Sequence, residues 1–331
     1  MKKWMKCMIA VSLAGMAAVT AACGGAGENK NASLENGKLK IGVVQIVQHS
    51  SLDLANKGFT DALKERGYDE SKVIFDQQNA QGDQSNLKSI VARFKNERPG
   101  LICAIATPSA QAAANEIKDI PIVGTAITDF TTAKLVQNDE APGGNVTGVS
   151  NLTSVDAQMD LARRLVPSAK KVGLIYCSSE VNSEVQANMV KEYAGKNNLI
   201  VEERTVNSVN DIQQVAESLI GACDFIYVPT DNVMASAIPT LVKVTDKAKI
   251  PVIAGAGSMA KDGALASLSV DYYTLGKQTG YLAADILDGK VKPENAPIQH
   301  QKEYKIVINK KNMDILGIAI PENILKSAEL L

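Results

Sequence analysis

The stretch Ile120-Pro121-Ile122-Val123 returns 130 residues later as Ile250-Pro251-Val252-Ile253, and this repeat decides the fold. Each copy is a short, continuous apolar run, the pattern of a strand buried on both faces of a parallel sheet. The preceding segments also correspond, because Ile105-Ala106-Thr107-Pro108-Ser109 and Tyr227-Val228-Pro229-Thr230-Asp231 each end a strand in a polar turn that opens a helix. The repeat therefore predicts two similar α/β lobes in one chain.

Strands and helices alternate on both sides of each copy. In the first half we expect strands at 40–46, 73–75, 101–106 and 120–124, and helices at 52–66, 84–96 and 108–118. In the second half we expect helices at 155–165, 183–196, 211–220 and 233–247, and strands at 172–176, 199–201, 225–228 and 250–255. A helix at 272–287 and a strand at 305–308 are too little for a third domain, so we expect them to complete the lobes.

The predicted fold class is therefore α/β, with two doubly wound parallel-sheet lobes joined by hinge crossings. We expect an N-terminal lobe at 38–148 plus 272–296 and a C-terminal lobe at 149–271 plus 297–331. Parallel α/β sheets bind ligands at the carboxyl ends of their strands, and hinged lobes can close around a small molecule. The sequence thus predicts a small-molecule site in the cleft between the lobes.

Composition excludes several classes of function. The 331 residues include 35 Lys+Arg and 36 Asp+Glu, without the basic excess of a nucleic-acid-binding protein. Hydrophobic residues make up 45% and charged residues 21%, values typical of a folded chain long enough for two domains. With only 2 His, a His-rich metal site is excluded, and we expect neither a metal nor a cofactor.

Residues 1–22 have the pattern of a lipoprotein signal peptide. The segment opens with three basic residues, Lys2, Lys3 and Lys6, and continues with an uncharged stretch at 8–22. That stretch of about 15 residues is shorter than the roughly 20 needed to span a bilayer. The junction Ala21-Ala22-Cys23-Gly24 resembles a lipoprotein cleavage box, although Thr20 stands where such boxes usually carry Leu. The alternative is an ordinary secretory signal that is cut after Ala22.

A flexible tether follows at 23–37, where Gly and Asn are frequent and apolar periodicity is absent. We therefore expect an exported body, anchored through a lipid on Cys23 to the outer face of the cell membrane, on the periplasmic side if the cell has an outer membrane. Cleavage after residue 22 also removes Trp4, the only tryptophan of the chain.

Three cysteines remain beyond Cys23, and each lies in or beside an apolar run: Cys103, Cys177 and Cys223. Cysteine in such a run usually serves as a small core hydrophobe. Their odd number and the lack of a C-x-x-C motif argue against a disulfide framework or a redox role.

Six motifs in order resemble a known family: Gln48-His49-Ser50-Ser51-Leu52-Asp53, Val228-Pro229-Thr230-Asp231-Asn232, and the segments 105–112, 125–129, 144–150 and 269–280. Together they resemble the ABC-transporter substrate-binding lipoproteins that include the TrpX-type tryptophan-binding proteins, over about residues 38–331. One departure is Ser50, because relatives commonly carry Pro after the His of the first motif.

The resemblance implies a type I periplasmic-binding-protein fold, most simply as a monomer. It implies capture of a small molecule outside the membrane and delivery to an ABC permease with a cytoplasmic ATPase. It also implies an aromatic amino acid as ligand. Branched-chain amino acids, sugars and nucleosides are alternatives, as is a ligand-sensing receptor role.

Polar residues at the predicted strand ends of the first lobe are candidates for binding. Thr107 and Ser109 flank Pro108, which suits the first position of a helix, and free N–H groups at that point favour an anion. We therefore expect a carboxylate there, the alternative being that Thr107 only caps the helix. Further candidates follow neighbouring strands: Gln48, Ser50, Ser51, Thr128 and Asp129, the last of which could equally be solvated.

The second lobe offers Ser178 and Asn182 after one strand and Asp231 and Asn232 after another. We expect Asp231 to bind an ammonium group, the alternative being a helix N-cap. Four aromatic residues could form a stacking wall, although such residues are more often core: Phe130, Tyr176, Tyr227 and Tyr272.

Enzymatic function is disfavoured. The run Gly255-Ala256-Gly257-Ser258-Met259-Ala260 matches G-x-G-x-x-A after a strand, but it closes the second lobe rather than opening a first βαβ unit. The sequence lacks a nucleophile elbow, a P-loop and an H-E-x-x-H motif, and His49 and His300 have no evident triad partners. We expect a binding protein rather than an enzyme.

Overall fold

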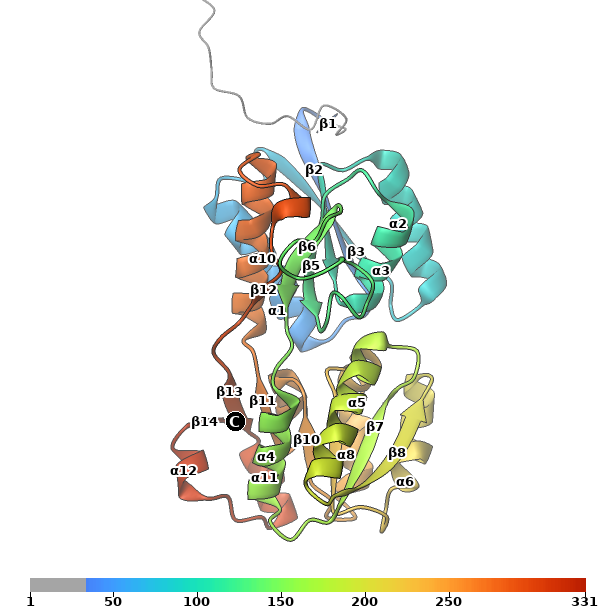
Figure 1. Ribbon diagram of the computed structural model, residues 1–331, viewed down its shortest axis with the longest axis vertical. Helices are drawn as coiled ribbons and strands as arrows, with labels where there is room; N and C mark the ends of the chain where they lie inside the picture. The colour runs from blue at the N-terminus through green and yellow to red at the C-terminus, as the bar shows by residue number, and fades with distance from the viewer. Residues whose placement is uncertain (1–33) are drawn as a thin grey trace, which may run out of the picture.

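The computed structural model describes residues 34–331, and two α/β lobes lie one above the other along its long axis (Figure 1). The predicted signal peptide, Cys23 and most of the tether lie outside the described residues. Within residues 34–331, no helix has the length and apolar character needed to cross a membrane.

The first lobe is built on a seven-stranded sheet with the order β1-β2-β4-β5-β6-β12, with β3 paired to β2. Its strands are β1 (Leu34–Glu35), β2 (Lys38–Gln45), β3 (Val73–Asn79), β4 (Leu101–Ile105), β5 (Ile122–Ile127), β6 (Val146–Ser150) and β12 (Gln299–His300). All pairings are parallel except β1 with β2. Four helices cover this sheet: α1 (Ser50–Glu65), α2 (Gln84–Glu97), α3 (Thr107–Glu116) and α10 (Tyr272–Leu287).

Helices α1 and α10 come from opposite ends of the chain and pack in backbone contact, side by side in Figure 1. A Cβ atom on Gly58 would lie 2.1 Å from the carbonyl oxygen of Tyr273, and one on Gly276 would lie 2.0 Å from that of Ala55. Only glycine fits at these two positions. The first lobe is therefore complete only when α10 is in place.

The second lobe has a seven-stranded sheet in the order β14-β13-β11-β10-β9-β7-β8. Its strands are β7 (Lys171–Cys177), β8 (Ile200–Val206), β9 (Phe225–Val228), β10 (Val252–Ala254), β11 (Ala266–Ser269), β13 (Lys305–Ile308) and β14 (Ala328–Leu330). The pairing of β11 with β13 is antiparallel and the others are parallel.

The helices of the second lobe are α4 (Val155–Leu165), α5 (Val181–Lys196), α6 (Ile212–Glu217), α7 (Asn232–Ser236), α8 (Ile238–Thr245), α9 (Gly257–Lys261), α11 (Lys310–Leu316) and α12 (Glu322–Leu325). Short 3-10 turns occur at Val209–Asp211 and Pro293–Asn295. The predicted class, two mostly parallel α/β lobes, is confirmed.

The chain crosses between the sheets after β6, after β11 and after β12, and the crossings are hydrogen-bonded to one another. The amide of Asn151 donates to the Tyr272 hydroxyl at 2.9 Å. The backbone N–H of Asp271 donates to Gln301 at 3.2 Å, and the Gln301 amide donates to the Asp271 carbonyl at 2.9 Å. Since β6 ends at Ser150 and β12 at His300, the crossings lie slightly beyond the boundaries expected at 148 and 296.

One predicted helix, at 233–247, is broken into α7 and α8 at Ala237, whose φ is −140°. Pro239 explains the break, because its ring clashes with the carbonyl of the residue four positions earlier and it lacks an N–H.

The predicted role of the three cysteines is confirmed, since all are unpaired and buried: Cys103, Cys177 and Cys223.

Candidate functional site

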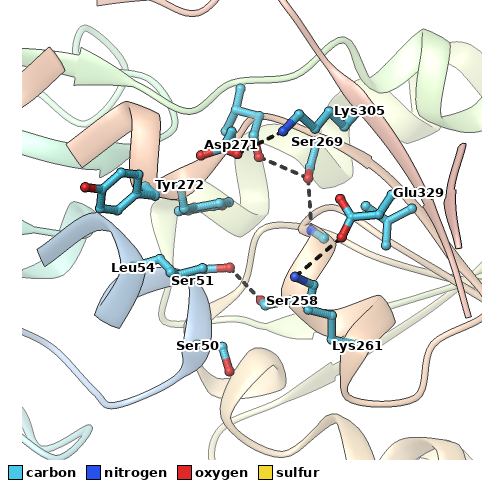
Figure 2. Close-up of a pocket in the computed structure, with 14 residues that line it drawn as sticks. Ser50, Ser51, Leu54, Ser258, Lys261, Ser269, Asp271, Tyr272, Lys305 and Glu329 are labelled. Carbon is cyan, nitrogen blue, oxygen red and sulfur yellow. Dashed lines mark hydrogen bonds and ion pairs between the residues drawn. The ribbon is translucent and has the colours of Figure 1, made fainter. Parts of the chain in front are cut away.

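The two lobes touch through polar side chains at the carboxyl ends of their strands. Thr128 Oγ1 lies 3.2 Å from Thr230 Oγ1, and His49 Nε2 lies 3.4 Å from the Asn232 side-chain oxygen. A third contact, 2.5 Å between the hydroxyls of Ser51 and Ser258, is drawn in Figure 2. The lobes are therefore closed on one another.

The first lobe contributes the start of α3. Thr107 is 1% exposed and Ser109 is 0% exposed, yet neither hydroxyl has a hydrogen-bond partner. The residue before them, Ala106, has φ 76° and ψ 156°, a conformation that is nearly exclusive to glycine. Hydroxyl groups without a hydrogen-bond partner at a helix N-terminus are suited to binding an anion such as a carboxylate.

The end of β5 is also irregular. The strand register shifts between Thr125 and Ile127, and the residue between them, Ala126, has φ 56°. The Thr125 hydroxyl is buried without a partner. Beyond the bulge, the Thr128 carbonyl accepts a hydrogen bond from Ser150 at 2.8 Å, which fixes the segment that contacts the other lobe.

In the second lobe a carboxylate that sequence reasoning missed, Glu180, organises the site. It precedes α5 and accepts hydrogen bonds from the side-chain amides of Asn182 at 2.9 Å and Asn232 at 2.6 Å. The backbone N–H groups of Asn232 and Val233 donate to it at 3.1 Å each. The side-chain oxygen of Asn182 is buried without a partner. The available signal was an acid at the boundary between a predicted strand and helix.

Asp231 is 1% exposed and binds within its own lobe. Its carboxylate accepts from the N–H of Met234 at 2.7 Å, the N–H of Cys177 at 2.6 Å and the Ser183 hydroxyl at 2.7 Å. The N-cap role of Asp231 on α7 is therefore confirmed, while its role toward an ammonium group stays a prediction.

Three other candidates have local partners, and a fourth is exposed. Gln48 is exposed and lies 3.4 Å from Asp53, and the Asp129 carboxylate accepts from the N–H of Thr132 at 2.7 Å. Ser178 is exposed and donates to Asn207 at 3.1 Å, and Ser50 is exposed at the start of α1. Of the remaining candidates, Ser51, Thr128 and Asn232 make contacts between the lobes. Thr107 and Ser109 flank Pro108, and Asn182 donates to Glu180; Pro108 and Glu180 line a cavity that both lobes border.

Two cavities lie between the lobes. One of about 280 Å³ is lined by Ile46 and Pro108 of the first lobe and by Glu180 and Asn232 of the second. The other, of about 300 Å³, is shown in Figure 2 between Ser50 on α1 and the α9 region. Its four charged groups form two ion pairs, Lys305 with Asp271 at 3.1 Å and Lys261 with Glu329 at 3.7 Å.

Burial dominates the electrostatics of the junction. It lowers the pKa of the His49 imidazole to about 4, so this side chain is neutral at pH 7. Burial, and then the nearby Asp231 charge, raise the pKa of Glu180 to about 8, and burial also raises the pKa of Asp231. Within residues 34–331, no group of His, Cys, Asp and Glu side chains is arranged to hold a metal ion.

The four predicted stacking aromatics lie in different places. The Tyr176 hydroxyl donates to Glu203 at 2.7 Å, and the fully buried Tyr227 bonds Gln158 in the core. Phe130 is also fully buried. Tyr272, at a hinge crossing, lines the cavity of Figure 2. The core alternative therefore holds for Tyr227 and Phe130.

Comparisons with known proteins agree with this architecture. Residues 40–330 match the family model of ABC transporter substrate binding proteins. A tyrosine-binding protein of Clostridioides difficile is 43% identical over 298 residues, which cover 88% of this chain and 86% of the relative.

Two solved structures are similar. The ABC domain from Streptococcus pneumoniae in complex with L-Trp is 41% identical, with a TM-score of 0.86, over 88% of this chain and 99% of that one. A ligand-free, open substrate-binding protein with adhesive properties from Clostridium difficile is 40% identical, with a TM-score of 0.68, over the same shares of 88% and 99%. The fold is that of the type I periplasmic binding proteins, and the chain belongs to the family of ABC transporter substrate-binding proteins.

Proposed function

We propose that this protein captures an aromatic amino acid in the interlobe cleft, as a monomer, and delivers it to an ABC permease with a cytoplasmic ATPase. One observation carries the proposal: buried polar atoms of both lobes lack partners, namely the oxygens of Thr107, Ser109 and Asn182. An unsatisfied buried polar atom costs about 1–3 kcal/mol. A ligand with both charged and hydrogen-bonding groups removes that cost.

In this proposal Thr107, Ser109 and the free N–H groups of α3 donate to the ligand carboxylate. The ammonium group faces the second lobe, where Glu180 and Asp231 supply negative charge and Asn182 supplies an acceptor. The aromatic preference is supported by the two relatives, one a tyrosine-binding protein and the other solved with L-Trp.

Calorimetry of residues 24–331 against the twenty amino acids tests the ligand. We expect heat with L-tryptophan, L-tyrosine or both, and none with leucine. Since Trp4 is absent from residues 24–331, bound tryptophan is the only indole, and its emission should shift on binding. No heat with any amino acid would contradict the proposal, and heat with leucine alone would favour the branched-chain alternative. Loss of labelled tryptophan uptake on deletion of the gene tests delivery.

We also propose that the mature protein is exported and held at the membrane by a lipid on Cys23. The support is the Ala21-Ala22-Cys23-Gly24 junction and the Gly/Asn-rich segment after it. Cys23→Ala should release the protein from the membrane fraction or leave it unprocessed. Incorporation of radioactive palmitate by this variant would disprove the anchor.

A further inference from the structure

Two carboxyl groups of the second lobe lie buried in one hydrogen-bonded cluster without a cation. Glu180 is 5% exposed and Asp231 is 1% exposed. The amide of Asn182 donates to Glu180 at 2.9 Å and contacts the Ser183 hydroxyl at 3.2 Å, and that hydroxyl donates to Asp231 at 2.7 Å. Within residues 34–331, no ion pair includes either acid.

The two acids differ in how many further hydrogen bonds their oxygens can accept. Both oxygens of Asp231 accept from α7, β7 or α5, and Asp231 does not line the cavity beside Pro108. Glu180 does line it, and one of its oxygens, Oε1, accepts a single hydrogen bond, from the N–H of Val233 at 3.1 Å. Glu180 Oε1 is therefore an acceptor with spare capacity in a cavity that both lobes border.

Among the residues that the structure describes, no neighbouring group supplies the missing positive charge. From the first lobe, His49 reaches Asn232 at 3.4 Å, but its lowered pKa of about 4 leaves it neutral above pH 5. From β7, Cys177 contacts Asp231 through its N–H, and burial raises the pKa of its thiol, so it is also neutral. Two carboxyl groups that are buried in one cluster without a cation cannot both be ionised without a large free-energy cost, so one of them keeps a proton.

We propose that Glu180 holds a proton in the ligand-free protein and releases it when an ammonium group enters the cleft, so that amino-acid binding is coupled to the loss of one proton. This inference rests on the proposed function, because it needs a ligand that carries an ammonium group. The O–H bond of Glu180 breaks, the proton passes to solvent, and the carboxylate accepts from the ammonium N–H. No electrons are transferred.

Calorimetry with L-tryptophan in two buffers measures the number of protons that are released on binding. At about pH 6.5, we expect the heats observed in phosphate and in Tris to differ by the difference between the ionisation enthalpies of the two buffers, with the sign of one proton released to the buffer. Because Glu180 titrates near pH 8, the dissociation constant should fall about tenfold per pH unit between roughly pH 6 and 7 and level off above 8. Equal heats in both buffers and a constant affinity would overturn the proposal.

Two matched variants separate this role from a structural one. Glu180→Gln keeps the shape but cannot ionise, so we expect at least about tenfold weaker binding at pH 8, without proton release and without pH dependence. Glu203→Gln is the control, because Glu203 on β8 contacts Tyr176 and Lys191 and lines neither cavity, and it should keep the wild-type proton count. Undiminished proton release by Glu180→Gln would overturn the proposal.

These experiments also separate a failure of the proton coupling from a failure of the proposed function. If the wild-type protein binds tryptophan without releasing a proton, the coupling is wrong and the proposed function stands. If it binds neither L-tryptophan nor L-tyrosine at any pH, the proposed function is wrong and the coupling with it.

Discussion

Ala106 keeps a backbone conformation that costs about 1–3 kcal/mol in a residue with a side chain. The strain lies directly before α3, where the Thr107 and Ser109 hydroxyls have no partner. Strain and unpaired polar atoms each lower the stability of the ligand-free protein. Their coincidence at one helix start is what a preorganised binding site requires, because the ligand then meets donors already fixed in direction.

Thr107→Val removes one unpaired hydroxyl and keeps the shape of the side chain. We expect ligand-free stability to stay constant or rise, because a buried unsatisfied group is lost, while affinity for tryptophan falls about tenfold. Thr147→Val is the control, since Thr147 is equally buried but donates to the Ala296 carbonyl at 2.7 Å.

The control variant should lose stability and keep its affinity. Thermal unfolding without ligand and calorimetry with tryptophan give both quantities for each variant. A stability loss in Thr107→Val that equals the loss in Thr147→Val, with no change in affinity, would show that the Thr107 hydroxyl is structural.

Glu180 also predicts how stability depends on pH. Its pKa is raised from 4.5 to about 8 in the folded protein, so between these values the folded state binds the proton more tightly than the unfolded state. The group's contribution to stability is full below about pH 4.5 and is lost as the pH rises through 8. Ligand-free Glu180→Gln should therefore gain in melting temperature, relative to wild type, from pH 5 to pH 8. The same difference at both pH values would contradict the raised pKa.

The sequence predicted candidate residues at the strand ends but could not predict the partners of each side chain. Thr107 and Ser109 became candidates because a strand, a polar turn and Pro108 follow one another locally. Asp231 was a candidate and Glu180 was missed, and the roles of both depend on partners from other elements: Cys177 and Ser183 bind Asp231, and Asn232 binds Glu180. Nothing in the sequence indicated that Ala106 has a positive φ, since alanine rarely adopts that conformation.

At the scale of elements, the contact between α1 and α10 depends on glycine. Gly276→Ala places a Cβ 2.0 Å from the Ala55 carbonyl oxygen, so the helices must move apart. We expect a loss of several kcal/mol in the free energy of unfolding, measured in urea. Gly195→Ala is the control, because Gly195 on α5 is exposed and nothing lies within 4 Å of its added Cβ. That change should stabilise by up to about 1 kcal/mol. Equal effects would contradict the close packing.

Periodicity predicted the long elements well, because apolar strands and amphipathic helices are local patterns. Helices α4 and α10 have the expected bounds, 155–165 and 272–287. Strands β11 and β14 were missed, since they are short and owe their conformation to pairing within the second lobe. Helices α11 and α12 were also missed, since 7 and 4 residues are too few for a clear helical periodicity. Sheet order is a tertiary property and no local pattern predicts it.

At the scale of the whole molecule, the lobes have the closed arrangement. With nearly equal identity, the TM-score is 0.86 to the structure with L-Trp and 0.68 to the ligand-free, open one. The three cross-lobe contacts are each a pair of small or neutral polar groups, so no ion pair among them holds the lobes shut. Such a junction can open and close at little cost, which suits a protein that must release its ligand.

A disulfide at the Ser51–Ser258 contact tests closure. The two hydroxyl oxygens lie 2.5 Å apart, close to the roughly 2.05 Å of an S–S bond, so Ser51→Cys with Ser258→Cys should cross-link on oxidation. We expect the oxidised double variant to keep a compact radius of gyration by small-angle scattering without ligand and to exclude tryptophan, and reduction should restore binding. Ser51→Cys alone is the control. Wild-type binding by the oxidised form would show that ligand enters without opening.

The three crossings determine when each lobe can complete its fold during synthesis. Helix α1 gains its partner α10 only after residue 287 has been synthesised, and the second sheet gains β13 and β14 only with the last residues. A domain whose segments are contiguous folds as it emerges, N-terminal part first. Here the first lobe cannot complete its fold before α10 has been made, and the second cannot before β13 and β14 have been made, so neither lobe reaches its final packing while only the preceding segments have been synthesised.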